Sequence, residues 1–158
     1  MDSDVFGNFL FITGWTCSAL ALYQIKAMGT KRWQKIVMIT QLVLLCLSNC
    51  WNIWEIFAPD SSSSIYFAIG FAWPVMGCFM IVTGLVILKA RKLSGWKRYM
   101  PFIAGLWFPM SVVIYFIFNG SMGSMLVSGI SSAIVFILLG LSLVVDNYEP
   151  AIRRKPSF

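Results

Sequence analysis

The segment Ile36–Phe57, IVMITQLVLLCLSNCWNIWEIF, is a long apolar run whose only charged side chain, Glu55, stands near its end. An α-helix rises about 1.5 Å per residue, so about 20 such residues cross the roughly 30 Å hydrocarbon core of a bilayer. Membrane β-strands alternate apolar and polar residues, and this run does not. The segment therefore predicts a membrane-spanning helix.

Apolar runs of this kind recur along the whole chain. The composition agrees, because 59% of the residues are hydrophobic, 11% are charged and the mean hydropathy is +0.80, whereas soluble domains average about 25% charged residues. We expect an all-α integral membrane protein with one transmembrane domain, a bundle of five helices, followed by a basic cytoplasmic tail at 146–158. The predicted spans are about 6–25, 36–57, 65–88, 99–118 and 122–145.

The basic residues are confined to alternate connections between these runs. In a five-helix bundle, the first connection, the third connection and the tail lie on one side of the membrane. The positive-inside rule then predicts an N-terminus outside and a C-terminus in the cytoplasm. This distribution is typical of topology determinants and does not predict a nucleic-acid partner. These three segments contain all 12 basic residues: Lys26, Lys31, Arg32, Lys35, Lys89, Arg91, Lys92, Lys97, Arg98, Arg153, Arg154 and Lys155.

Two halves of the chain resemble each other at one constant offset without a gap. The matching residues indicate an internal repeat, in which 7–57 and 70–120 are two copies of a helix pair. The fifth predicted helix lies outside this repeat. Small residues spaced by about seven stay on one helix face, where they allow close packing in a membrane. Such stripes are Gly7, Gly14 and Ala21 in the first half and Gly70, Gly77 and Gly84 in the second.

The spans also contain two prolines, Pro74 and Pro109, and one serine stripe, each of which predicts a local feature. Each proline lies inside a predicted span and removes a backbone hydrogen bond, which tends to kink a helix. The stripe Ser124, Ser128 and Ser132 of the fifth span either packs inside the bundle or against a second subunit.

The polar residues of the second span share one helix face, because Gln41, Leu45, Ser48, Asn52 and Glu55 alternate spacings of four and three. Polar groups in a span face protein or a water-filled cavity. Two interpretations of Glu55 stay open: a group at the membrane interface, or one that lines an outward-facing cavity.

The same reasoning selects candidate ligand-binding residues on both sides of such a cavity. Ser111 and Tyr115 stand on the repeat-equivalent face of the fourth span, and several tryptophans could form aromatic walls. The alternative for the tryptophans is core packing or lipid contact. The candidates are Glu55, Asn52, Ser48, Trp51, Ser111, Tyr115, Trp15, Trp73 and Trp107.

Catalytic chemistry has little support in this sequence. Histidine, the commonest acid–base catalyst near neutral pH and a frequent metal ligand, does not occur. Paired acids within the spans and phosphate-binding or metal-binding motifs are also lacking. We therefore expect a non-enzymatic protein without a cofactor or a bound metal.

The segments Trp73–Gly77, Lys89–Trp96 and Gly105–Pro109 resemble small bacterial multi-pass membrane proteins without an assigned function. The resemblance covers about half of the chain and implies location in the bacterial cytoplasmic membrane. In size, helix count and tryptophan content the chain is also similar to the translocator protein family, which would imply a lipophilic ligand, although the diagnostic motifs of that family do not occur here.

Two transporter families share single features with the chain. Tyr23-Gln24 followed by Thr30-Lys31 is similar to the Pro-Gln turn of three-helix sugar transporters, with tyrosine in place of proline. Small multidrug exporters use one membrane glutamate among aromatic residues, but in the first of four helices, whereas Glu55 lies in the second of five predicted helices.

Two functions follow as hypotheses. The first is a polytopic protein that binds a lipophilic small molecule or a lipid within its bundle, or that packs as a subunit of a larger membrane complex. The second is a small transporter, proton-coupled through Glu55, that works as a homo-oligomer. Membrane lipids are expected partners in either case, because the basic connections attract anionic headgroups.

Overall fold

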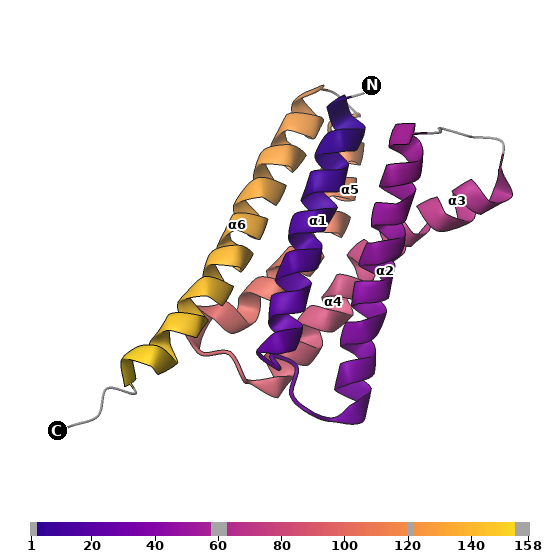
Figure 1. Ribbon diagram of the computed structural model, residues 1–158. Helices are drawn as coiled ribbons and strands as arrows, with labels where there is room; N and C mark the ends of the chain where they lie inside the picture. The colour runs from indigo at the N-terminus through magenta and orange to yellow at the C-terminus, as the bar shows by residue number, and fades with distance from the viewer. Residues whose placement is uncertain (1–2, 58–62, 120–121, 154–158) are drawn as a thin grey trace.

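The computed structural model describes the backbone of residues 3–57, 63–119 and 122–153, and the side chains of residues 5–57, 63–119 and 127–143. These residues form helices and no strand (Figure 1), which confirms the all-α prediction. In chain order the elements are α1 (Ser3–Gln24), α2 (Arg32–Phe57), α3 (Ser64–Gly70), α4 (Ala72–Ala90), the short 3₁₀ helix η1 (Gly95–Tyr99), α5 (Met100–Ile117) and α6 (Met122–Arg153).

Four helical segments within the described residues are long and apolar enough to cross a membrane: Val5–Gln24, Arg32–Phe57, Ser64–Ala90 and Gly95–Ile117. They agree with the first four predicted spans. The fifth predicted span lies in α6, whose described apolar part is the shorter helix Val127–Leu143. The fifth crossing and the orientation therefore stay predictions. The helix α6 itself continues to Arg153, into the segment expected to be a tail.

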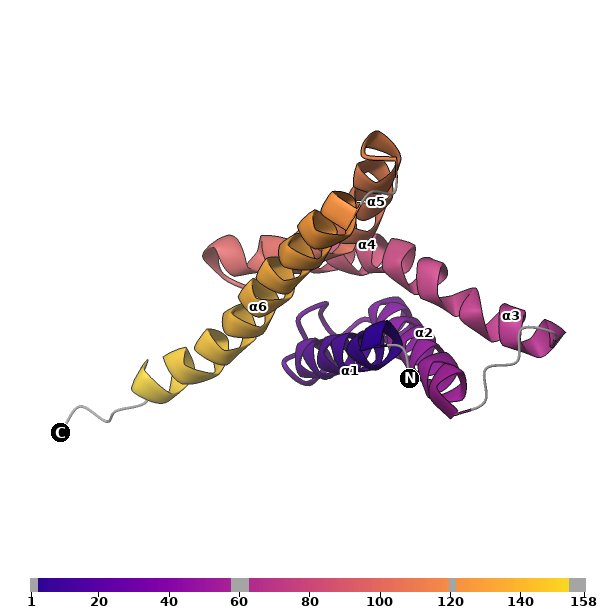
Figure 2. The same cartoon turned by 90° about the horizontal axis from the view of Figure 1, so that it is seen from above.

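The helices form an open bundle in which α6 runs diagonally. Figure 2, seen from above, places α1 and α2 together on one side of the line formed by α4 and α3, while α6 crosses the bundle at an angle. One buried cluster joins α1, α2, α4, α5 and α6 through residues that include Trp15, Leu45, Met80, Ala104 and Leu139. A second cluster lies nearer the α1–α2 connection and includes Leu22, Met38 and Ile87.

The surface is apolar and part of the interior is polar, as expected for lipid as the solvent. Large hydrophobic side chains point outward, among them Phe57 at 82% exposure and Phe116 at 72%. In contrast, Gln41 and Asn52 are completely buried. A protein that folds in water has the opposite arrangement, with apolar side chains inside and polar ones outside. The observed distribution therefore agrees with four helices of membrane-spanning length.

The backbones of α4 and α5 touch at two glycines. A Cβ atom on Gly84 would lie 2.4 Å from the Cα of Phe102, and one on Gly105 would lie 2.7 Å from the backbone nitrogen of Ile81. Contacts below 3.0 Å leave no room for a side chain. The two helices therefore pack at the short distance that only glycine permits, a common device between membrane helices.

The third span is broken where the sequence predicts a kink. Helix α3 ends at Gly70 and α4 starts at Ala72, and Pro74 follows Gly70 by four positions. Proline has no N–H for the carbonyl four residues earlier, and its ring pushes against that carbonyl. By contrast, α5 continues through Pro109 without interruption.

Candidate functional site

The polar face of α2 points into the bundle, as its spacing predicts. Gln41, Leu45, Ser48 and Asn52 have 0% exposure. The Ser48 hydroxyl donates to the carbonyl of Leu44, one turn earlier on the same helix, at 2.9 Å. The amide oxygen of Gln41 accepts a 3.3 Å hydrogen bond from the Thr83 hydroxyl of α4. The buried face thus provides a polar contact between α2 and α4.

Several buried atoms on this face have no hydrogen-bond partner in the described part of the protein. They are the amide nitrogen of Gln41, the side-chain oxygen of Asn49 and both amide atoms of Asn52. An unpaired buried amide costs roughly 1–3 kcal/mol. The inner face of α2 therefore retains capacity for hydrogen bonds beyond those that its own helices use.

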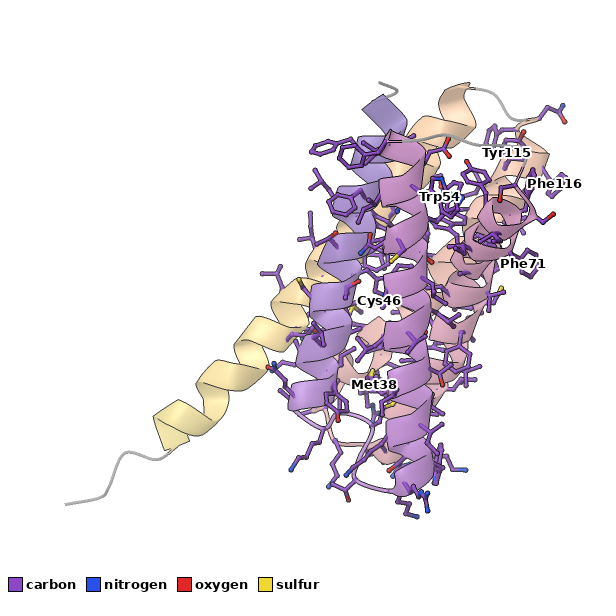
Figure 3. The ribbon with its side chains drawn as sticks, turned by 45° about the vertical axis from the view of Figure 1, so that its right-hand side comes forward. Met38, Cys46, Trp54, Phe71, Tyr115 and Phe116 are labelled. Carbon is purple, nitrogen blue, oxygen red and sulfur yellow. The ribbon has the colours of Figure 1, made fainter. Side chains whose placement is uncertain are left out.

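Glu55 connects α2 to α3. Its carboxylate accepts a hydrogen bond from the hydroxyl of Tyr66, a residue of α3 that is nearly buried. The rings of Trp51 and Trp54 lie 5.7 Å and 6.1 Å from the Tyr66 ring, measured between centroids. Figure 3 shows Trp54 on the side of α2 that faces α3. Glu55 is thus one member of a polar and aromatic contact between two helices.

Gly70 makes room for this contact. A Cβ atom on Gly70 would lie 2.9 Å from the indole nitrogen of Trp51, so the indole ring rests directly against the backbone at the end of α3. The indole N–H of Trp51 is buried and has no hydrogen-bond partner in the described part of the chain.

A separate cleft of about 570 Å³ opens between α1, α4, α5 and α6. Four of the predicted residues line it: Trp73 of α4 and Trp107, Ser111 and Tyr115 of α5. No residue of α2 lines this cleft. The other lining residues are Asn8, Phe108, Val112 and Ser128.

Two polar side chains of the cleft, those of Ser111 and Trp107, form hydrogen bonds with Ser128 of α6. The Ser128 hydroxyl donates to the Ser111 hydroxyl at 2.8 Å, and the indole N–H of Trp107 donates to the Ser128 carbonyl at 3.4 Å. Part of the serine stripe therefore packs inside the bundle: Ser128 contacts α5, and Ser132 is buried. Ser124, also predicted in this stripe, lies outside the residues with described side chains.

An aromatic cluster lies behind the cleft. Trp73 meets Phe108 edge-on at 5.3 Å, while Trp107 packs against Phe11 at 5.3 Å and against Phe136 at 6.1 Å. Trp15 contacts the same Phe136 at 5.0 Å but is only 1% exposed. Trp15 therefore belongs to the core and does not line the cleft.

The nine predicted residues thus fall into two groups and one core residue. Glu55, Trp51, Ser48 and Asn52 belong to α2, and four others line the cleft. Asn8, Phe108 and Tyr66 also contribute to these two groups and were not among the predicted residues. Asn8 carried a readable signal, because it is an amide within an apolar run. Phe108 and Tyr66 are aromatic residues among many, and nothing in their spacing distinguishes them.

The described residues contain no group of three or more His, Cys, Asp or Glu side chains placed to hold a metal ion. No protein-family model, no curated protein and no solved structure matches the chain. The described part of the protein is all-helical, has four helices that can cross a membrane, consistent with an integral membrane protein, and holds an aromatic cleft between its helices.

Proposed function

We propose that this protein binds a lipophilic small molecule or a lipid in the cleft between α1, α4, α5 and α6. The observation that carries the proposal is the lining of that cleft: large aromatic side chains with a few polar groups, in about 570 Å³. Sites for small ligands typically measure 300–1,000 Å³ and combine mostly apolar walls with a few placed polar groups. The proposed role is binding and requires no catalytic group.

The chemistry of the lining sets the class of ligand. Trp73, Trp107 and Phe108 offer flat apolar surface, whereas Asn8 and the Ser111–Ser128 pair offer amide and hydroxyl groups. The described lining contains no charged side chain. A neutral amphiphile, with an apolar body and one or two hydroxyl or carbonyl groups, fits this lining best.

Adjacent valines provide a matched test. Val112 lines the cleft and Val113 does not, although both are exposed, at 39% and 55%. A Val112→Phe substitution should fill the cleft, while Val113→Phe adds the same ring outside it. The probe is a total lipid extract of the expression host, and the readout is the unfolding temperature of the detergent-purified protein.

A ligand that binds only the folded state raises that temperature. The extract should stabilise the wild type and Val113→Phe but not Val112→Phe. Equal stabilisation of all three proteins would contradict binding in this cleft and would assign the effect to general lipid contact.

We also propose five membrane spans with the N-terminus outside. The support is the position of the basic residues: the α1–α2 and α4–α5 connections lie at the same end of the bundle (Figure 1), and residues from both line one cleft there. Clustered lysines and arginines favour the cytoplasmic side.

Single cysteines in a cysteine-free background test this arrangement. Ser63→Cys and Asn119→Cys should react with an impermeant thiol reagent on intact cells, whereas Ser94→Cys and Ser157→Cys should react only after permeabilisation. Labelling of Ser157→Cys from outside would contradict a fifth crossing, and the fully reversed pattern would contradict the orientation.

A small transporter that works as a homo-oligomer is the second candidate. The observation that favours it is the row of buried amide atoms of Gln41 and Asn52, unpaired within the described residues, on the same face of α2 as Glu55. Polar rows of this kind mark ion and substrate pathways in membrane proteins. Uptake of tetraphenylphosphonium into proteoliposomes under a pH gradient should then depend on Glu55 and be lost in Glu55→Gln; equal uptake would reject proton coupling.

A further inference from the structure

A second cleft, of about 410 Å³, lies at the basic end of the bundle, between the start of α2 and the end of α4. Three lysines line it: Lys31 just before α2, Lys89 in the last turn of α4, and Lys92 just after α4. They come from two connections that are far apart in the sequence. The described residues that line this basic cleft do not include any that line the cleft between α1, α4, α5 and α6.

The three ammonium groups have no acidic partner among the described side chains. The single described acidic side chain is Glu55, at the opposite end of α2. Positive charges gathered in one place repel one another. A cleft lined by such charges attracts an anion.

The backbone of the first connection is held in place beside these lysines. The backbone N–H of Lys31 donates to the side-chain oxygen of Gln34 at 3.0 Å, an arrangement that caps the start of α2. Gly29 adopts φ +101°, and a Cβ there would lie 2.6 Å from the Gln34 oxygen. Gly29 and Gln34 both line the cleft. The start of α2 also presents the positive end of a long helix dipole.

An apolar path leads from the lysines along the outer face of α4. Phe71, Val75, Cys78, Val82, Leu85 and Lys89 alternate spacings of four and three, and all are exposed. Figure 3 shows Phe71 pointing outward on this side. A groove of about 370 Å³ follows the same face, lined by Phe71, Pro74, Val75, Cys78, Phe79 and Val82.

The part of this path nearest the lysines, which includes Phe79 and Val82 of the groove, has the length of one lipid leaflet. Half of a roughly 30 Å hydrocarbon core is about 15 Å, or about ten residues of helix. Counted from Lys89, ten residues reach Phe79, inside the apolar groove. Trp33, which is 48% exposed and lines the basic cleft, is a residue typical of the headgroup level.

We propose that this surface binds an anionic phospholipid, with its phosphate among Lys31, Lys89 and Lys92 and one acyl chain along α4 as far as Val82 and Phe79 of the groove. The charge, the capped start of α2 and the apolar path each match one part of that molecule. A soluble phosphate compound would use the lysines but would leave the groove empty. The site is separate from the one assigned to a neutral ligand, and its test does not depend on that assignment.

The test compares two double variants with equal loss of charge. Lys31→Gln/Lys89→Gln removes two lysines of the cleft; Lys26→Gln/Lys35→Gln removes two exposed lysines of the same end that do not line it. The full-length proteins are placed in nanodiscs of equal parts palmitoyl-oleoyl phosphatidylglycerol and phosphatidylcholine. Retained lipids are then counted by native mass spectrometry.

Each lysine close to an anionic headgroup contributes about fivefold to its binding, and this contribution falls off within a Debye length, so lysines outside the cleft contribute less. We expect the preference for phosphatidylglycerol to fall by roughly tenfold or more in the cleft variant, and clearly less in the control variant. Equal losses in both would overturn the proposal and leave only diffuse attraction to the basic end.

Two further experiments distinguish a bound lipid from a bound free phosphate: a variant that blocks the groove, and a competition with inorganic phosphate. Val82→Trp should block the groove and lower retention of phosphatidylglycerol, while Ile130→Trp, on exposed α6, should not. Millimolar inorganic phosphate should fail to displace the lipid. If phosphate displaces the lipid and Val82→Trp has no effect, the site recognises soluble phosphate, and the lipid proposal is wrong.

Discussion

Two glycine stripes with the same spacing have opposite surroundings. In the second half of the chain, a Cβ on Gly70, Gly77 or Gly84 would lie 2.9, 2.7 or 2.4 Å from a neighbouring atom. In the first half, a Cβ on Gly7 or Gly14 would meet nothing within 4 Å. A stripe of small residues therefore permits close packing but does not determine whether another helix comes close.

The difference follows from what faces each stripe. On the α3–α4 line, the three glycines face the Trp51 ring, the Phe108 ring and the backbone of α5 in turn. On α1, the helix packs through Ile12, Trp15 and Ala19, which lie between the glycine positions on another face. The glycines of α1 are therefore left open, to lipid or to a second subunit.

The largest expected effect is at Gly84. A Gly84→Ala methyl group would meet the backbone of Phe102, which cannot move without separating α4 from α5. Overpacking of a fixed site costs about 1–3 kcal/mol or more. We expect a loss of at least about 2 kcal/mol in the free energy of unfolding, measured by titration with sodium dodecyl sulfate. A neutral result would show that α4 and α5 are not in backbone contact.

A smaller effect is expected at Gly77. A methyl group there would lie 2.7 Å from the Phe108 ring, and a side chain can rotate where a backbone cannot. Gly77→Ala should cost about 1 kcal/mol and push Phe108 toward the cleft that it lines. The unfolding titration measures the cost, and stabilisation by the lipid extract should weaken. A loss as large as that of Gly84→Ala would show that Phe108 cannot move.

The α2–α3 contact of the same half can be tested at Tyr66. Tyr66→Phe removes the hydroxyl that donates to Glu55 and leaves a half-buried carboxylate without this partner. A hydrogen bond to a charged group contributes about 1.5–3 kcal/mol, so a loss of about 1 kcal/mol is expected at this partly exposed site. Tyr115→Phe, at a half-exposed tyrosine of α5, is the control. Equal unfolding curves for both variants would remove Glu55 from the α2–α3 contact.

The smallest effect, of opposite sign, is expected at Gly14. Alanine is favoured over glycine in a helix by roughly 0.5–1 kcal/mol, and the Cβ would meet open space. Gly14→Ala should therefore stabilise the isolated protein slightly in the same titration. Destabilisation, accompanied by a change in subunit number in native mass spectrometry, would show that a second subunit covers this face.

The length and the periodicity of the apolar runs were sufficient for the features that depend on a single helix. Run length predicted the four membrane-length helices, together with a fifth crossing that the described residues do not test. Periodicity predicted the inward face of α2, because a polar group in lipid must turn toward protein. The break before Pro74 could also be expected from the missing N–H. These inferences need only the chain within one span.

The site depended on how separate helices cross. The candidates on α2 and on α5 were expected to share one cavity, but the cleft is built from α1, α4, α5 and α6, and Glu55 contacts Tyr66 of α3 instead. The diagonal path of α6, which brings Ser128 to Ser111, leaves no mark in the local spacing. Equally, nothing in the two glycine stripes distinguishes the one that packs from the one that stays open.

Binding in the cleft is tested most directly by the intact mass of the gently purified protein, measured by native mass spectrometry for the wild type, Val112→Phe and Val113→Phe. We expect a retained neutral lipophilic molecule on the wild type and on Val113→Phe that is absent from Val112→Phe. A protein that carries no such molecule, or one that is retained equally by all three, would contradict a binding site between α1, α4, α5 and α6.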